Sequence, residues 1–276
     1  MDIRSLLEEG SQILKKNDIS TYKLDCEILM SKAIKESREF VIMNQSKKVN
    51  FICSNFFKDL IKERAKGKPV AYILGMKDFW KYQFNLTEDV LIPRPETELI
   101  IENVLSLTKY KKKLNILDIG TGTGCILMSI LKEKPKFYGV GIDVSKKCID
   151  LSRTNATNLG LKNKVKFFKT DVDKFNHGKY DLIVSNPPYI KNIDLKYLEK
   201  DVINFEPILA LSGGLEGLSE IRKVINKASE LIKKNGKLVL EIAFDQKYKV
   251  INLLKDKKFY INKILKDYSK NDRCII

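Results

Sequence analysis

Histidine is nearly absent from this chain, since His177 is the only one among 276 residues. Metal sites built from several histidines are therefore excluded, although one histidine still allows a Ser-His-Asp triad. No apolar run reaches the roughly 18 residues that a membrane span needs. The opening stretch, MDIRSLLEEG, is acidic and amphipathic, unlike a signal peptide. We expect no membrane association, and chemistry that proceeds with little acid–base or metal assistance.

The cysteines lack the spacing of a zinc site or a disulfide framework. They are odd in number, scattered, and contain no CxxC pair: Cys26, Cys53, Cys125, Cys148 and Cys274. This usage favours reduced thiols and no structural zinc. We therefore expect a cytoplasmic protein.

Acidic residues are outnumbered, with 35 Asp and Glu against 51 Lys and Arg, which gives a net charge of +16. Such a balance suits a nucleic acid or a ribosome-associated partner. The lysines are spread along the chain, however, as they are in proteins from compositionally biased proteomes. Both interpretations stay open, and the charge does not decide the function.

Helical periodicity dominates the first 70 residues. Apolar residues recur at helical spacing over residues 2–16, and Ser20 or Thr21 is placed to cap a second helix. A third helix is predicted after Asn50, with an inner face formed by Phe56, Phe57, Leu60 and Ile61. We expect a small helical domain over residues 1–72 that serves packing or substrate docking, because it carries no catalytic signature.

Aromatic and β-branched residues characterise the next stretch, from Val70 to Val90. VAYILG and DFWKYQFNLTEDV predict a β-hairpin that links two domains over residues 73–90. LIPRPETELI then begins a domain of residues 91–276, with a helix start at the PETE segment. Arg94 and Glu98 are candidate ion partners, and the rigid segment could equally form the floor of a substrate site.

A glycine-rich turn gives the strongest cofactor signal. The apolar strand LNILDIG runs into Gly120, Thr121, Gly122, Thr123 and Gly124, and a helix begins at Cys125. Glycines allow a tight turn and close approach of a ligand to the backbone. The pattern is DxGxGxG, typical of S-adenosylmethionine (AdoMet) sites, rather than the GxGxxG of dinucleotide sites. A second strand ends at Asp143, where a carboxylate would bind ribose hydroxyls or, alternatively, cap the next helix.

Two further strands end in polar residues. VKFFKTD ends at Asp171, which is either an acceptor for an adenine amino group or a solvated loop carboxylate. YDLIVSNPPY is a buried strand followed by Asn186, Pro187, Pro188 and Tyr189. The prolines end the strand and stiffen the loop. A planar group bearing an NH2 could donate to the Asn186 side-chain oxygen and the Pro187 carbonyl while lying against Tyr189, although a strand can also end in an ordinary proline-rich turn.

The remaining chain completes an α/β pattern. A long insertion follows the NPPY loop, then a helix from Ile221 that Asn235-Gly236 should stop, then the strand KLVLEIA. A further helix and two strands, around residues 259–265 and 273–276, finish the sheet. The carboxyl ends of the parallel strands should place Gly120, Asp143, Asp171 and Asn186 along one edge.

These motifs together carry a family resemblance over nearly the whole chain. PVAYILG, LIPRPETE, VSNPPYI, FEP, the AL-GG segment and the terminal DR resemble the HemK/PrmC family. The resemblance implies a class I AdoMet-dependent methyltransferase fold, Rossmann-like, with a mostly parallel seven-stranded sheet. It also implies methylation at N5 of the glutamine in the GGQ motif of bacterial peptide chain release factors. NPPY alone is shared with adenine methyltransferases of nucleic acids, whereas LIPRPETE with FEP is more specific.

The resemblance also implies roles for individual residues. AdoMet contacts are implied for Gly120 to Gly124, Asp143, the Asp171–Val172 turn and Asn186. Glutamine binding is implied for Asn186, Pro187, Pro188 and Tyr189, with catalytic roles for Asn186, Pro187 and Tyr189. Val172 stands where many members have a bulky aromatic, and Ala243 stands where glycine is common. Release factors are the implied partners, and we expect no metal and no direct binding of nucleic acid.

Two alternatives remain beside this interpretation. The same pocket could act on a ribosomal-protein glutamine or on an adenine amino group of nucleic acid. The chain could also bind AdoMet or the ribosome without catalysis, although the complete NPPY motif argues against that.

Overall fold

The computed structural model describes residues 1–276, which divide into two compact units: residues 1–76 with 199–205, and residues 77–198 with 206–276. The helices of the first unit are α1 (Ile3–Lys16), α2 (Tyr22–Ile34), α3 (Arg38–Met43), α4 (Phe51–Ala65), α5 (Val70–Leu74) and α9 (Lys200–Phe205). Short polar side chains cap three of them: Asp2 accepts from the Ser5 N–H and Asn50 from the Cys53 N–H, each at 2.8 Å, and Ser37 accepts from the Phe40 N–H at 3.2 Å. The helix predicted after Asn50 is confirmed.

Several local predictions for the first unit were wrong. Thr21 stands just before α2 but does not cap it, because its hydroxyl donates to Asp25 at 2.8 Å instead. Phe56 lies 42% exposed, whereas the other three members of the predicted inner face of α4 are buried. Residues 73 and 74, expected in the hairpin of residues 73–90, belong instead to helix α5 (Val70–Leu74), which Gly75 ends in the left-handed conformation at a φ of 74°. A β-rich composition therefore did not decide the conformation of this short segment.

The hairpin itself is formed by β1 (Met76–Phe79) and β2 (Tyr82–Asn85). Phe79 and Phe84 meet edge to face, with ring centroids 6.3 Å apart, and both are buried in the apolar core of the second unit.

The second unit is built on a seven-stranded sheet in the order β5-β4-β3-β6-β7-β9-β8. Its strands are β3 (Asn115–Ile119), β4 (Tyr138–Asp143), β5 (Val165–Lys169), β6 (Tyr180–Ser185), β7 (Ile232–Glu241), β8 (Ile264–Lys266) and β9 (Asp272–Ile275). The five strands from β5 to β7 pair in parallel, and β9 pairs antiparallel with both β7 and β8. The predicted class I methyltransferase fold is confirmed.

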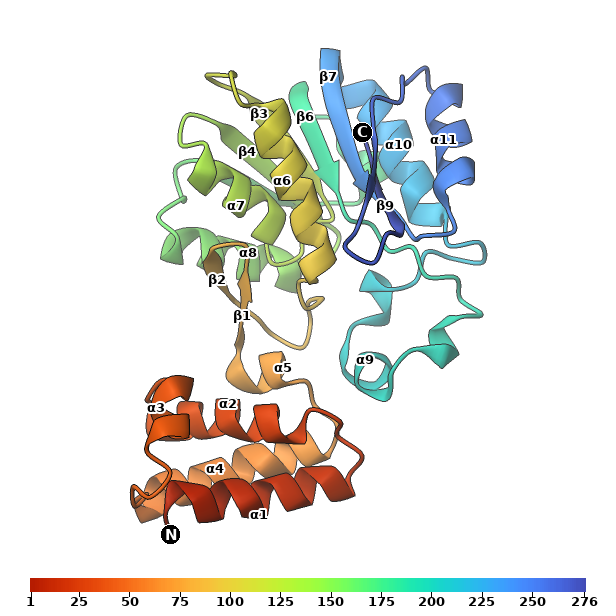
Figure 1. Ribbon diagram of the computed structural model, residues 1–276. Coiled ribbons are helices and arrows are strands. Elements are labelled where there is room, and N and C mark those ends of the chain that lie inside the picture. The colour runs from red at the N-terminus through yellow and green to blue at the C-terminus, as the bar shows by residue number, and fades with distance from the viewer. The chain divides into compact units, whose positions relative to one another are not determined.

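Two apolar cores cover the faces of this sheet, because successive side chains of a strand point to opposite faces. Leu182 and Val184 pack with α6 (Glu98–Leu107), α7 (Cys125–Glu133) and α8 (Lys146–Asn158). Ile183 packs with α10 (Ser219–Leu231) and α11 (Lys247–Asp256). Figure 1 shows α6 and α7 in front of the sheet and α10 and α11 beside β7. The helices thus leave the strand ends, rather than the faces, available for a site.

Short 3-10 turns complete the second unit: η1 (Pro95–Thr97), η2 (Val172–Lys174), η3 (Leu195–Tyr197) and η4 (Ile208–Ala210). The helix expected to run to Asn235-Gly236 ends earlier, at Leu231. Asn235, at a φ of 62°, and Gly236 lie inside β7, where the pairing with β6 shifts register. None of the helices in either unit combines the length and the apolar character that a bilayer crossing requires.

Candidate active site

Four parallel strands end at the same edge of the sheet. Gly120 follows β3, Asp143 ends β4, Asp171 follows β5 and Asn186 follows β6. The strand order runs outward in both directions from the β3–β6 pair, so this edge contains the topological switch point. Ligands of open α/β sheets bind in the crevice at such a point. The structure therefore brings the residues predicted from the four strand ends to one edge, as expected.

The glycine turn has a backbone that only glycine adopts easily. Gly120, Gly122 and Gly124 all have positive φ, at 74°, 54° and 80°. A Cβ on Gly124 would lie 2.3 Å from the Met128 side chain, whereas one on Gly120 would meet nothing within 4 Å. The turn thus packs tightly toward α7 and leaves the backbone at Gly120 open to a ligand. Thr121 and Thr123 are buried between the glycines.

Two carboxylates support the turn. The Asp118 side chain is fully buried and accepts from the Thr121 hydroxyl at 2.7 Å, while its Oδ1 has no hydrogen-bond partner. Burial raises the pKa of Asp118 to about 7. Asp143 accepts from the backbone N–H of Gly122 at 3.0 Å and of Ser145 at 2.9 Å. Since a carboxylate has about four acceptor sites, Asp143 keeps capacity for ligand hydroxyl groups.

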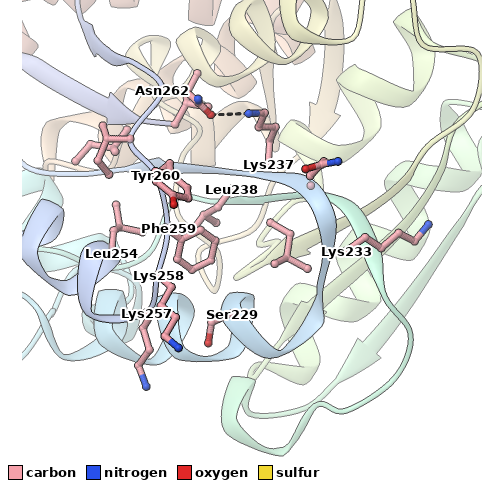
Figure 2. A pocket seen from close by; sticks show the side chains of 16 residues that line it. Ser229, Lys233, Lys237, Leu238, Leu254, Lys257, Lys258, Phe259, Tyr260 and Asn262 are labelled. Carbon is pink, nitrogen blue, oxygen red and sulfur yellow. Dashed lines mark hydrogen bonds between the residues drawn. The ribbon is translucent and has the colours of Figure 1, made fainter.

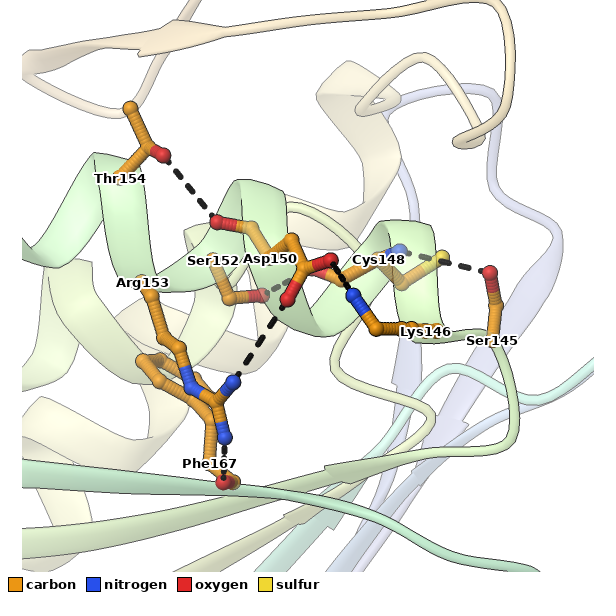
Figure 3. Close-up of polar contacts among 8 residues, drawn as sticks. All are labelled: Ser145, Lys146, Cys148, Asp150, Ser152, Arg153, Thr154 and Phe167. Carbon is orange, nitrogen blue, oxygen red and sulfur yellow. Dashed lines mark hydrogen bonds and ion pairs between the residues drawn. The ribbon is translucent and has the colours of Figure 1, made fainter.

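Asp143 is not the cap of the helix that follows it. Ser145 occupies that position, and its hydroxyl oxygen accepts from the Cys148 N–H at 3.3 Å (Figure 3). Figure 3 also shows α8 fastened by Arg153, which pairs with Asp150 and donates to the Phe167 carbonyl of β5 at 3.0 Å. The alternative in which Asp143 serves only as a cap is therefore not supported by the geometry.

The Asp171–Val172 turn is the least defined part of the cofactor prediction. Asp171 accepts from the Asp173 N–H at 2.9 Å and so caps η2. This contact is the one expected of a loop carboxylate, and a second role in binding adenine stays a prediction. Val172 is half-buried and packs against the core formed with α10 and α11.

The NPPY loop is anchored at each of its polar residues. The Asn186 amide nitrogen donates to the Thr97 hydroxyl at 3.0 Å. The Tyr189 hydroxyl donates to Glu241 at 3.3 Å, and Gln246 donates to the Tyr189 carbonyl at 3.0 Å. Pro187 is buried, and Pro188 is half-buried. The loop is therefore held by side chains from three other segments, which is more than an ordinary proline-rich turn needs.

Sequence reasoning missed these three anchors. Thr97 lies in the quoted PETE segment and Glu241 in the quoted LEIA strand, but neither received a role, and Gln246 carried no local signal. Only the fold brings Thr97, 89 residues away in the chain, against Asn186. The suggestion that the PRPE segment forms the floor of a substrate site is consistent with this contact.

The predicted ion pair between Arg94 and Glu98 was wrong. Arg94 pairs with the buried Glu206 of the FEP segment at 2.6 Å. Glu98 instead accepts from the backbone N–H of Trp80 at 2.6 Å. The prediction chose a carboxylate near Arg94 in the sequence, whereas the fold supplies one that lies 112 residues away.

A separate cavity of about 570 Å³ lies near the amino end of β7 (Figure 2). Four lysines line it together with apolar and neutral polar side chains: Lys233, Lys237, Lys257 and Lys258. It contains no carboxylate side chain, histidine or cysteine, and none of the predicted site residues. We therefore assign the candidate active site to the strand ends at the opposite edge.

Comparisons with known proteins concern the family and the fold of the chain rather than individual site residues. Residues 5–75 match the family described as PrmC N-terminal domain, and residues 110–274 match the family described as methyltransferase domain. The release factor glutamine methyltransferase of Buchnera aphidicola is 34% identical over 100% of this chain and 98% of its own length. The enzyme of the same name from Fusobacterium nucleatum is 35% identical over 98% of this chain and 77% of its own.

Two more distant matches extend the comparison. A bifunctional methyltransferase of Rickettsia conorii is 30% identical over 99% of this chain, which spans 57% of that protein. Among solved structures, the ribosomal protein L11 methylase of Lactobacillus delbrueckii has a TM-score of 0.51 at 18% identity. That match covers 72% of this chain and 89% of the other, and it supports the fold alone.

Proposed function

Because the chain belongs to the HemK/PrmC family of release factor glutamine methyltransferases, we propose that it methylates N5 of the glutamine in the GGQ motif of a release factor. The chain is a methyltransferase that uses AdoMet. The observation that carries the proposal is the Asn186 side chain. Its amide nitrogen is bound to Thr97, so its carbonyl oxygen remains to accept from a substrate NH2.

The proposed mechanism relies on positioning. An amide nitrogen is a poor nucleophile because its lone pair is conjugated, whereas the AdoMet sulfonium supplies an activated methyl group. Asn186 and the Pro187 carbonyl accept hydrogen bonds that hold the NH2 in line and strengthen as nitrogen gains positive charge. The Tyr189 ring lies against the planar group. The methylated nitrogen would then lose a proton to solvent, and no covalent intermediate on the protein is required.

The proposed cofactor site uses the neighbouring strand ends. The open backbone of the glycine turn at Gly120 to Gly124 accommodates the close approach of AdoMet, and Asp143 binds its ribose hydroxyls. The Asp171–Val172 turn would contact the adenine. Asn186 would contact both the cofactor and the substrate.

A side-by-side assay tests the proposed substrate. Release factor, ribosomes and DNA are each incubated with the protein and labelled AdoMet. We expect label in release factor alone. Label in a ribosomal protein or in adenine would show that the same reaction takes place on another NH2 group. No label in any of the three substrates would favour a protein that binds AdoMet without catalysis.

The helical segment of residues 1–72 is proposed to recognise the protein substrate. Phe51 and Ile52 begin α4, and each is 79% exposed. These two apolar side chains are therefore available to contact a protein partner. Replacing both with alanine should raise KM for release factor severalfold, while the KM for a short GGQ peptide and the AdoMet affinity stay unchanged. Tyr110→Ala, at a residue 87% exposed in the other unit, is the control. Equal KM values for release factor in the double variant and the parent protein would contradict this docking role.

We also propose that the protein acts in the cytoplasm. All five cysteines are free thiols, and burial is the main cause that raises the pKa of the four buried ones: Cys26, Cys125, Cys148 and Cys274. Inert, reduced thiols suit a reducing compartment.

A further inference from the structure

The amino ends of the parallel strands form the edge of the sheet opposite the candidate active site. Figure 1 shows this edge at the top of the view, where β6 and β7 begin. The three segments that lead into and include β3, β4 and β5 contain eleven lysines and arginines and no Asp or Glu: residues 103–117, 134–142 and 151–170. The whole chain has 35 Asp and Glu among 276 residues, so abundant lysine alone does not account for segments without a carboxylate.

The fold brings these segments together around Tyr138, the first residue of β4. β5, β4 and β3 are consecutive in the sheet, where neighbouring strands lie about 4.8 Å apart. The ammonium nitrogen of Lys164 lies 4.4 Å from the centre of the Tyr138 ring, and that of Lys113 lies 5.3 Å from it. Lys134 donates to the Thr108 carbonyl at 3.1 Å, which adds a third cation beside the loop that precedes β3.

The lysines at these strand starts have no carboxylate partners. We use the name basic edge for the eight lysines that precede the three strands: Lys109, Lys111, Lys112, Lys113, Lys134, Lys136, Lys162 and Lys164. None of them forms an ion pair, and two carboxylates that border the edge have other partners. Glu133 pairs with Lys81, and Asp181 pairs with Lys233, each at 2.9 Å. Unpaired charges of one sign repel one another, so stability does not explain the basic edge.

Exposed aromatic rings lie among these cations. Tyr110 stands between Lys109 and Lys111 in the sequence and is 87% exposed, and Tyr138 is 41% exposed. Proteins that bind single-stranded nucleic acids combine cations that follow the phosphates with aromatic rings on which the bases stack. A membrane surface would instead favour an amphipathic helix with an apolar face, and these residues precede strands. The combination of cations and rings therefore favours a nucleic acid.

We propose that the basic edge binds the sugar–phosphate backbone of single-stranded RNA, with Tyr110 stacking on a base. RNA is chosen over DNA because the proposed substrate is a protein of translation, and only this choice rests on the proposed function. The family resemblance led us to expect no direct binding of nucleic acid, so the inference departs from that expectation. It also gives a location to the nucleic-acid interpretation of the positive net charge.

The RNA is a docking partner and not the acceptor of the methyl group. Tyr138 begins β4 and Asp143 ends it, so the two edges are about 17 Å apart along that strand. The carboxyl edge carries Asp118, Asp143 and Asp171, which repel phosphate groups. RNA at the basic edge therefore leaves the AdoMet site and the NPPY loop free.

Binding of a fluorescently labelled oligouridylate, measured by anisotropy over a range of salt concentrations, tests the proposal. The triple variant Lys111→Gln, Lys112→Gln, Lys113→Gln should raise Kd by about one to two orders of magnitude at physiological salt. The slope of log K against log salt should become shallower by about 2, or about 0.7 for each lost phosphate contact. The control triple variant removes the same charge from exposed lysines of the helical unit: Lys16→Gln, Lys23→Gln, Lys48→Gln. It should leave both values unchanged.

Two further variants separate the backbone contacts from stacking. Lys136→Gln combined with Lys162→Gln, which lie in the other two segments, should also make the salt slope shallower, by about 1.4. Tyr110→Ala should weaken RNA binding by about fivefold to 100-fold while the slope stays the same, because stacking releases no counterions. AdoMet affinity and methyl transfer to release factor, measured without RNA, should be unchanged in all of these variants.

Several results would overturn the inference. Equal losses in the two triple variants, or an unchanged salt slope in the Lys111–Lys113 variant, would show that the charge acts only as a general background. Tighter binding of polyglutamate, of vesicles of phosphatidylglycerol or of oligothymidylate would assign the edge to an acidic protein, a membrane or DNA instead. A wild type that binds the oligouridylate as expected without methylating release factor would contradict the proposed function and leave the binding site in place.

Discussion

Replacing Asn186 with alanine is expected to lower the rate of methyl transfer by about 10²–10³, the usual loss for one preorganised group at a reacting centre. The expectation follows from the geometry of the loop, where Thr97 holds the Asn186 nitrogen and leaves the oxygen for the substrate. Because that acceptor acts most strongly as nitrogen becomes positive, the loss should fall on the chemical step. AdoMet binding should stay largely intact.

Asn186→Asp provides the matched variant. It keeps an acceptor and the side-chain shape but lacks the NH2 that donates to Thr97, and it adds a negative charge. We expect partial activity in the aspartate variant and almost none in the alanine variant, measured by steady-state and single-turnover assays on one release factor. Near-normal turnover in both would mean that the NPPY loop is only a turn.

Replacing Asp143 with alanine should weaken AdoMet binding by roughly 1.5–3 kcal/mol, or about one to two orders of magnitude in Kd. The variant removes the carboxylate proposed to bind both ribose hydroxyls. It also removes the acceptor of the Gly122 N–H, which lies 3.0 Å from Asp143 and helps to hold the glycine turn. Both losses, of the ribose contact and of the support for the glycine turn, should weaken the binding of AdoMet.

Calorimetry with AdoMet measures this effect, and Asp143→Asn should give a smaller loss because it keeps one acceptor. Asp150→Ala is the control, because that aspartate lies on the exposed side of α8 and pairs only with Lys146 and Arg153 (Figure 3). An unchanged Kd for AdoMet in the Asp143→Ala variant would show that Asp143 does not bind the ribose.

The sequence allowed the parallel strands and their polar ends to be predicted because both signals are local. Each buried strand is recognisable in the sequence as a short apolar run. Each run is followed by a residue that ends the strand, such as Gly120 or Pro187. The alignment of those ends then follows from the geometry of a parallel sheet. The glycine pattern indicated the cofactor, whereas the proposed substrate came from the HemK/PrmC resemblance.

Long-range contacts were beyond this reasoning. Arg94 was given the nearby Glu98 as its partner, whereas the fold supplies Glu206 from 112 residues away. Glu241 appeared as one polar residue at the end of an apolar strand, and only the structure brings it to Tyr189. Composition also misassigned residues 73 and 74, which belong to helix α5, since the tertiary context of a short segment can override its β propensity.

Mass analysis of a release factor after incubation with this protein and labelled AdoMet tests the central claim most directly. The digest is searched for the peptide that carries the GGQ motif, and fragmentation locates the label within it. The proposed function predicts a single added methyl group on the side-chain nitrogen of the glutamine, absent when Asn186→Ala replaces the wild type. An unmodified GGQ peptide, or a methyl group on another residue, would contradict the proposal.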